Sequence, residues 1–178
     1  MIVDRVVLVG FMGAGKTSVG RSLARRLGWR FVDVDTVVAE RSGRGIDEIF
    51  RTDGEGAFRL LEAAAATDAL REAHVVVATG GGWAAREGAL ESLPSGCVSV
   101  WLGVGAEEAV RRAEGDASVR PLLAVEDPLE NASRLLSGRR PFYRRADVRV
   151  DTEGRSVDDV TTRILEILQE FETETGAE

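Results

Sequence analysis

The stretch that decides the fold of this 178-residue chain is GFMGAGKT, residues 10–17. It fits the phosphate-binding pattern G-x-x-x-x-G-K-[ST] at every fixed position. The glycines let the backbone curl so that N–H groups face an anion, the lysine places a point charge on the β- and γ-phosphates, and the threonine offers a hydroxyl to Mg²⁺. Lys16 is the only lysine among 23 basic residues, so the chain keeps its one ammonium group for this motif.

A short glycine-rich match can also be an ordinary turn without a ligand, so the motif requires a strand before it and a helix after it. Residues 3–9 are a run of mostly β-branched residues, typical of a strand buried on both faces. Leu23 and Leu27 continue a helical apolar spacing, and Gly28 follows as a stop. Both flanks favour a nucleotide-binding loop, whose expected contacts are Gly13, Ala14, Gly15, Lys16, Thr17 and Ser18.

Apolar runs alternate with helical patterns along the chain, which is typical of an α/β fold with a parallel sheet flanked by helices. We expect one domain over residues 1–178 and five strands. Ligands of such sheets bind at the carboxyl ends of the strands, so the residues that follow each strand are candidates for the site. The predicted strands span residues 3–9, 30–34, 74–78, 98–102 and 148–150, and the later helices span 36–41, 45–72, 106–113, 127–144 and 156–171.

The composition argues against several classes of function. A net charge of −7 leaves no broad basic face for nucleic acid or for an acidic membrane. One cysteine, Cys97, and one histidine, His74, cannot make an intrachain disulfide or a zinc site, and we expect both to be filling residues of the core or surface. The chain has neither a signal sequence nor an apolar run near 18 residues, so we expect a cytoplasmic protein. Nothing in the sequence signals an obligate partner, and we expect a monomer.

Two acids follow the second predicted strand. A phosphate-loop enzyme needs a carboxylate on the metal side, and Asp33 is the best candidate because the third and fourth strands end without an acid. Asp35 either serves the site or caps the helix expected to begin near Thr36. The Asn-Lys-x-Asp motif of GTPases needs a second lysine, and the subdomains of large ATPases need a longer chain, so a small-molecule or nucleotide kinase remains.

Three of the 22 arginines stand out by their setting, although any arginine can be a solvated surface charge. Arg59 follows Phe58 in a predicted helix, and Arg139 ends another helix before a proline. Arg120 follows a polar, glycine-bearing stretch that we interpret as a mobile lid, about residues 113–125. Because guanidinium groups fork onto carboxylates and phosphates, two converging arginines would suit an acidic substrate.

Six motifs in this order resemble those of the shikimate kinase family across nearly the whole chain. They are GFMGAGKT at 10–17, DVD at 33–35, DGE with FR at 53–59, GGG at 80–82, VRPLL at 119–123 and RRPFY at 139–143. The resemblance implies a P-loop fold like that of nucleoside monophosphate kinases. It also implies ATP-dependent phosphorylation of the 3-hydroxyl of shikimate, a step of aromatic amino-acid biosynthesis, with ATP and shikimate as the expected partners.

On the acceptor side, the resemblance implies a substrate-binding segment at about residues 34–62. Asp35 would hold the ring hydroxyls and take the proton of the attacking one. Arg59 and Arg139 would grip the carboxylate, assisted by the N–H of Gly81.

On the nucleotide side, the resemblance implies that Lys16 and Arg120 neutralise the charge that develops on the transferred phosphoryl group. Thr17 and Asp33 would hold Mg²⁺, the expected cofactor. The implied contacts with adenine are Arg112 and Arg155.

Trp83, directly after the three glycines, is larger than the residue expected at this position. It either packs in the core or faces the acceptor and alters which ring is accepted. Two other functions stay open: a related kinase of another small hydroxy acid such as gluconate, and a non-catalytic homologue that binds nucleotide and regulates a partner. The acceptor set of Asp35, Arg59 and Arg139 disfavours the first. The second is disfavoured because Lys16, Asp33 and Arg120 are all present.

Overall fold

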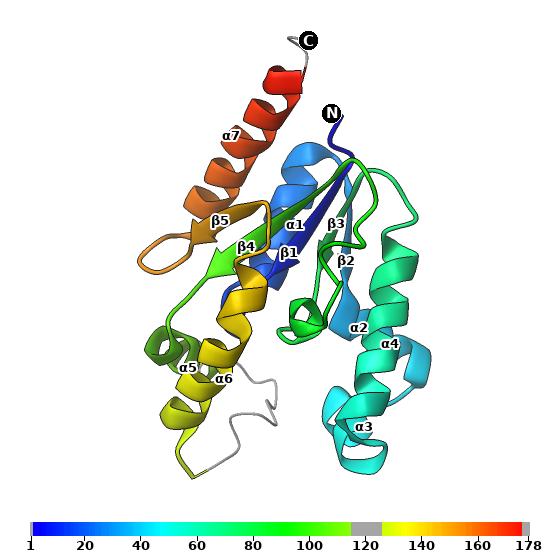
Figure 1. Cartoon of the computed structure of the whole chain (residues 1–178), viewed down its shortest axis with the longest axis vertical. Coiled ribbons are helices and arrows are strands. Elements are labelled where there is room, and N and C mark those ends of the chain that lie inside the picture. The colour runs from blue at the N-terminus through cyan, green and yellow to red at the C-terminus, as the bar shows by residue number, and fades with distance from the viewer. Residues whose placement is uncertain (1, 115–125, 176–178) are drawn as a thin grey trace.

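Five parallel strands form one sheet at the centre of the computed structural model, which describes residues 2–114 and 126–175 (Figure 1). Their spatial order is β2-β3-β1-β4-β5, so the strand before the phosphate loop lies in the middle. The predicted sheet is confirmed, and each strand begins and ends within two residues of its predicted range. The strands are β1 Arg5–Val9, β2 Arg30–Asp33, β3 Val75–Ala78, β4 Cys97–Gly103 and β5 Val148–Asp151.

The central strand β1 carries β-branched residues because both of its faces and both of its edges are covered. Residues 6–9 are completely buried, and Val7 pairs with Val77 on β3 and with Ser99 on β4. A strand in this position has no solvent-facing side on which a polar residue would be stable. Cys97 at the start of β4 belongs to the same core, and burial raises the pKa of its thiol to about 12.

Helices cover the sheet and extend beyond the carboxyl ends of its strands. α1 packs against β3, β2 and the long carboxy-terminal helix α7, and α4 packs against β3 (Figure 1). In the same view α2, α3 and α4 lie on one side of the sheet's lower edge, and α5 and α6 lie on the other. The helices are α1 Lys16–Leu27, α2 Val34–Ser42, α3 Ile46–Thr52, α4 Gly54–Ala69, α5 Ala106–Glu114, α6 Pro128–Tyr143 and α7 Val157–Thr175, with a 3₁₀ turn η1 at Trp83–Ala85.

Three predicted helix boundaries are wrong. The single helix expected over residues 45–72 is two helices, because Gly54 takes a φ of +82° and Arg44 holds the Asp53 carboxylate at the break with contacts of 3.1 and 2.6 Å. α2 begins at Val34, two residues earlier than expected, since Asp33 caps it. The carboxy-terminal helix continues to Thr175, past its predicted end at residue 171.

The carboxyl ends of parallel strands share one edge, and this edge carries the candidate site. The phosphate loop follows β1, Asp33 ends β2, and the glycines 80–82 come just after β3. The predicted lid falls almost wholly on residues 115–125, which lie outside the described residues, and Arg120 falls there with it. Within the described ranges, no helix has both the length and the apolar character needed to cross a membrane.

Candidate active site

The loop between β1 and α1 forms the first part of the site. Its last residue, Gly15, caps α1 in the left-handed region with a φ of +86°, and as a glycine it offers no side chain to cap the N–H groups of the first helical turn. Those groups cannot have partners within the helix, and they stand at the positive end of its dipole. The loop and the first turn of α1 therefore form an anion-binding site of the kind that the sequence pattern predicts.

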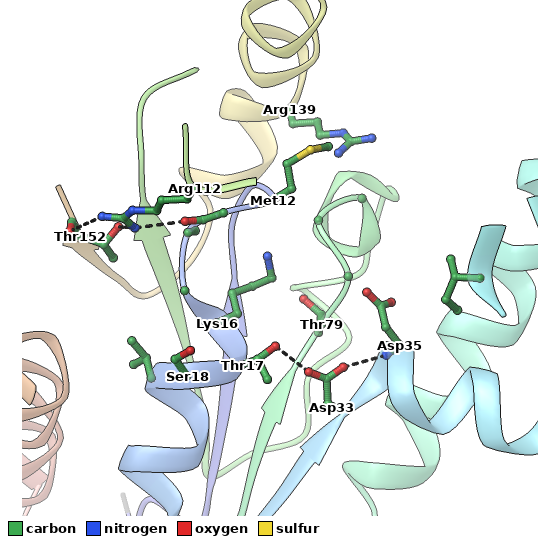
Figure 2. A pocket seen from close by; sticks show the side chains of 18 of the residues that line it. Met12, Lys16, Thr17, Ser18, Asp33, Asp35, Thr79, Arg112, Arg139 and Thr152 are labelled. Carbon is green, nitrogen blue, oxygen red and sulfur yellow. Dashed lines mark hydrogen bonds between the residues drawn. The ribbon is translucent and has the colours of Figure 1, made fainter. Parts of the chain in front are cut away.

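Lys16 lies across this loop. Its Nζ donates hydrogen bonds to the carbonyl oxygens of Gly10, at 2.9 Å, and of Phe11, at 2.8 Å. Thr17 and Ser18 follow it on the exposed first turn of α1, and all three residues line a cavity beside the loop (Figure 2). The ammonium group is thus held beside the backbone donors instead of extending into solvent.

A chain of hydrogen bonds links the phosphate loop to the two acids after β2 (Figure 2). The Thr17 hydroxyl donates to Oδ2 of Asp33 at 2.7 Å. The other oxygen of Asp33 accepts from the backbone N–H groups of Asp35, at 3.1 Å, and of Thr36, at 3.3 Å. Asp33, and not Asp35, is therefore the N-cap of α2, which leaves the Asp35 side chain among the residues that line the cavity.

The Thr17–Asp33 pair is suited to Mg²⁺. This ion usually takes one or two protein oxygens and completes its octahedron with phosphate oxygens and water. The described residues contain no cluster of three or more acidic, histidine or cysteine ligands that would form a complete protein cage. A hydroxyl and a carboxylate next to a phosphate-binding loop match the chemistry of such a partial site.

Arg59 and Glu62 form a partly buried ion pair on α4 and line the same cavity as Asp35. Nη1 of Arg59 lies 2.8 Å from Oε2 of Glu62, whose side chain is 1% exposed, and Nη2 lies 2.9 Å from Oε1 of Glu55. The glycines after β3 make room for this pair. A Cβ on Gly82 would overlap the guanidinium group, and a Cβ on Gly80 would overlap the carboxylate of Glu62.

Burial raises the pKa of Glu62, and the charge of Arg59 offsets this only in part. The folded state therefore binds this proton more tightly than the unfolded state, so Glu62 makes the free energy of unfolding decrease as the pH rises from 4.5 to its raised pKa. We expect Glu62→Gln to remove this decrease. Urea unfolding of both proteins between pH 4.5 and 8 measures it, with Glu55→Gln as control, and a wild-type-minus-variant difference independent of pH would contradict the assignment.

Arg139 reaches the same wall of the cavity from α6. Its guanidinium lies 5.8 Å from the centre of the Phe11 ring, and a Cβ on Gly81 would lie 3.6 Å from its Nη1. Within the described residues, the N–H groups of Gly81 and Gly82 have no hydrogen-bond acceptor. Two guanidinium groups and two backbone donors thus gather beside Asp35, which is an arrangement suited to a carboxylate.

Arg112 connects the other wall of the cavity to the phosphate loop. Its Nη1 donates to the carbonyl of Gly13 and to the hydroxyl of Thr152, both at 3.1 Å, and its Nη2 donates to the carbonyl of Thr152 at 2.9 Å. Glu108, one turn earlier on α5, holds its Nε at 2.6 Å. Arg155 is exposed on the same side, in the loop between β5 and α7.

These groups surround a single cavity of about 830 Å³, in which Arg112 and Asp35 lie at opposite ends with Lys16 between them (Figure 2). Of the predicted site residues, only Arg120 lies outside the described part of the chain. Although the whole chain is acidic, the charged side chains that line this cavity are mainly basic. They are Lys16, Arg59, Arg112, Arg139 and Arg155 against Asp33, Asp35 and Glu62.

Trp83 packs in the core. Its side chain is 4% exposed and does not line the main cavity. It borders a smaller adjoining cavity of about 310 Å³, which shares Arg59 and Arg139 with the main one. The packing alternative for this residue is therefore the one that the structure supports.

Two side chains on the same helices as Arg59 and Arg139 were not predicted from the sequence, namely Glu62 and Tyr143. Both were within reach of a helical argument, because Glu62 lies three residues after Arg59 and Tyr143 four residues after Arg139, on the same helix face in each case. Gly80 and Gly82 were also missed as contacts. No sequence signal indicates that Glu62 and Arg59, which lie far earlier in the chain, approach Gly80 and Gly82.

The geometry agrees with what comparisons with known proteins show. A sequence profile described as Shikimate kinase matches residues 12–169. This chain belongs to the shikimate kinase family. The shikimate kinase of Moorella thermoacetica is 44% identical over 164 residues, which are 92% of this chain and 94% of that protein. The shikimate kinase of Symbiobacterium thermophilum is 44% identical over 167 residues, 93% of this chain and 96% of that protein.

Solved structures of the family superpose closely. The shikimate kinase from Acinetobacter baumannii in complex with shikimate has a TM-score of 0.89 and 35% identity, covering 94% of both chains. The enzyme from Aquifex aeolicus has a TM-score of 0.82 and 36% identity, covering 95% of this chain and 98% of the other. The family, the P-loop kinase fold and the ATP-dependent kinase class predicted from the sequence are confirmed.

Proposed function

We propose that this kinase transfers the γ-phosphoryl group of ATP to the 3-hydroxyl of shikimate, giving shikimate 3-phosphate and ADP. The observation that carries the proposal is one cavity with two ends of different chemistry. A phosphate-binding loop with its lysine stands at one end, and a carboxylate-binding pair of arginines with an acid stands at the other. A nucleoside triphosphate matches the end with the phosphate-binding loop, and an acidic acceptor with ring hydroxyls matches the end with the arginines.

The nucleotide would lie with its phosphates on residues 13–18. Backbone N–H groups there would bind the β- and γ-phosphate oxygens, and the Lys16 ammonium would neutralise their charge. Arg112 is fixed by Glu108 and by Thr152, so its guanidinium presents a rigid flat surface. We assign Arg112 and Arg155 to the contact with adenine.

Mg²⁺ would be held by Thr17 and Asp33, together with phosphate oxygens and water. When bound, the ion would supply positive charge that offsets the charge of the phosphates and of the leaving group. The hydrogen bond of 2.7 Å between the two side chains places both oxygens at one point beside the loop, which supports this assignment.

The acceptor would bind with its carboxylate on Arg59 and Arg139 and on the N–H of Gly81. Glu62 holds Arg59 from behind, so the guanidinium is oriented before the substrate arrives. Asp35 would accept hydrogen bonds from the ring hydroxyls. These groups together select an acceptor whose carboxylate and hydroxyl lie a fixed distance apart, as they do on a rigid ring.

In the reaction, the 3-oxygen of shikimate forms a bond to the γ-phosphorus while the bond from that phosphorus to the β–γ bridging oxygen breaks. The proton of the attacking hydroxyl passes to the Asp35 carboxylate, and the electron pair leaves with ADP. Lys16 and the lid residue Arg120 would stabilise the charge on the transferred group. Phosphoryl transfer asks mainly for positioning and charge neutralisation, which these residues are placed to supply.

Further parts of the proposal come from the sequence and from the family resemblance. They are the acceptor segment at about residues 34–62, the lid at about residues 113–125, a monomeric state, a cytoplasmic location and a place in aromatic amino-acid biosynthesis. A gluconokinase from Sinorhizobium meliloti shares the fold, with a TM-score of 0.62, but only 18% of the sequence. That similarity concerns the fold alone and gives no support to gluconate as the acceptor.

We expect Arg139→Ala to raise the KM for shikimate about 10- to 100-fold and to leave the KM for ATP within about twofold, because a lost charge-assisted contact costs about 1.5–3 kcal/mol. Steady-state kinetics with each substrate varied in turn measures the effect. Arg140→Ala is the matched control, since Arg140 is next to Arg139 in the chain but is exposed and does not line the cavity. An equal rise in both Michaelis constants would refute the assignment of Arg139 to the carboxylate.

A further inference from the structure

Tyr143 is a fully buried side chain at the end of α6 that the proposed chemistry does not use. Its hydroxyl donates a hydrogen bond to the carbonyl oxygen of Gly81, 62 residues away in the chain. Arg139, one helical turn earlier, lies beside the same glycine, since a Cβ on Gly81 would lie 3.6 Å from its Nη1, and its charge acts on the Tyr143 hydroxyl. One buried phenol thus contacts the backbone of the proposed carboxylate site beside one of its guanidinium groups.

The state of this hydroxyl suits a permanent donor. Burial raises the pKa of Tyr143 to about 12, although the charges of Arg139 and Arg59 act in the opposite direction. The phenol therefore keeps its proton throughout the neutral range. Its ring is held by Trp101 on β4, with ring centres 5.9 Å apart, so the hydroxyl has a fixed position relative to the sheet.

The contact controls more than the carbonyl that it reaches. A trans peptide directs its C=O and its N–H to opposite sides of one plane, and the described residues contain no cis peptide. Fixing the carbonyl of Gly81 therefore fixes the direction of the N–H of Gly82. That N–H has no acceptor among the described residues, and Gly82 lines the cavity beside Arg59.

The three glycines 80–82 need such an anchor. Glycine has the largest backbone freedom of any residue, and a run of three has no side chains with which to restrict it. Larger residues are excluded at Gly80 and Gly82 because Glu62 and Arg59 occupy the space of their side chains. The carbonyls of Gly80 and Gly82 accept local hydrogen bonds from the N–H groups of Trp83 and Ala85, both at 3.1 Å, and Tyr143 holds the remaining carbonyl, that of Gly81, from outside the segment.

We propose that Tyr143 is a positioning residue for acceptor binding: its hydroxyl holds the Gly81–Gly82 peptide, beside Arg139, in the arrangement that receives the carboxylate. This inference rests on the proposed function for the identity of the acceptor. It adds that a residue without contact to substrate sets the affinity for the carboxylate through the backbone of the glycine segment.

The test is Tyr143→Phe, which removes the hydroxyl and keeps the ring. The KM for shikimate rises about tenfold, the loss of about one well-placed hydrogen bond, while the KM for ATP and kcat stay within about threefold. Shikimate methyl ester, which has no carboxylate charge, gives a second readout. The preference of the enzyme for shikimate over the ester, as a ratio of kcat/KM values, falls in the variant.

Thr161→Val is the matched control. Thr161 is also fully buried, and its hydroxyl donates to a backbone carbonyl, that of Val157, at 2.7 Å within α7. It does not line the cavity, so both Michaelis constants stay at wild-type values. If Tyr143→Phe changes neither the KM for shikimate nor the preference over the ester, or changes both Michaelis constants equally, the positioning role is overturned.

Activity of the wild type is measured first, so that failure of the proposed function is recognised separately. A wild type that does not phosphorylate shikimate refutes the proposed acceptor. The anchoring of the glycines is then decided by amide hydrogen exchange in both proteins. Faster exchange at Gly81 and Gly82 in Tyr143→Phe, and not in Thr161→Val, supports the anchor, and unchanged exchange at these residues overturns it.

Discussion

Lys16→Met is expected to lower kcat by about 10³-fold while the protein stays folded, because removing one preorganised donor from a developing charge typically costs that much. Methionine keeps the length of the aliphatic stem and removes only the ammonium group. That group is held over the phosphate loop by the carbonyls of Gly10 and Phe11, where the transferred phosphoryl would lie. Initial rates at saturating ATP and acceptor measure the loss.

Circular dichroism checks that the Lys16 variant remains folded, since two hydrogen bonds to the loop are lost with the ammonium. Arg25→Met is the matched control, because Arg25 is exposed on the same helix and does not line the cavity. It removes the same charge from α1 and leaves kcat unchanged. Near-normal turnover of Lys16→Met would refute the role of the lysine in phosphoryl transfer.

Asp35→Asn is expected to lower kcat by about 10²-fold or more, which is the usual contribution of a positioned general base. Asparagine keeps the shape of the side chain and most of its hydrogen bonding but does not take the proton of the attacking hydroxyl. The cap of α2 is unaffected, because Asp33 provides it. Single-turnover phosphorylation of shikimate separates this loss from any change in product release.

The control for Asp35 is Asp47→Asn, an exposed acid in the first turn of α3. It removes one negative charge near the cavity and leaves kcat unchanged. If Asp35→Asn keeps more than about half of the wild-type kcat, general-base catalysis by this residue is contradicted. A raised KM for shikimate at normal kcat would instead assign Asp35 to binding alone.

Local patterns were sufficient to predict the nucleotide half of the fold. The phosphate loop with its strand and helix needs only neighbouring residues, since the glycines, the lysine and the apolar periodicity all lie between residues 3 and 28. The three inner strands were predicted for the same reason, because runs buried on both faces are mostly apolar, and the edge strands β2 and β5 were predicted from shorter apolar runs. The break between α3 and α4 was missed because Arg44, nine residues before Asp53, stabilises it.

The acceptor half depends on contacts between distant segments, which one sequence does not reveal. Arg59, Gly81 and Arg139 come from three separate elements, and only the family resemblance brought them together before the structure did. The contact between Tyr143 and Gly81 has no local signal at all. Asp35 was ambiguous for a similar reason, because a cap and a site residue look alike until the helix start is known.

The central claim is that the acceptor for which the arginine end of the cavity is built is shikimate. Release of ADP from Mg-ATP with shikimate tests it most directly, beside gluconate, quinate and a sample without acceptor, with Lys16→Met as the blank and mass spectrometry of the product. The account predicts ADP release and shikimate 3-phosphate with shikimate alone. Equal or faster release with gluconate or quinate, or none with any acceptor despite ATP binding, would contradict it.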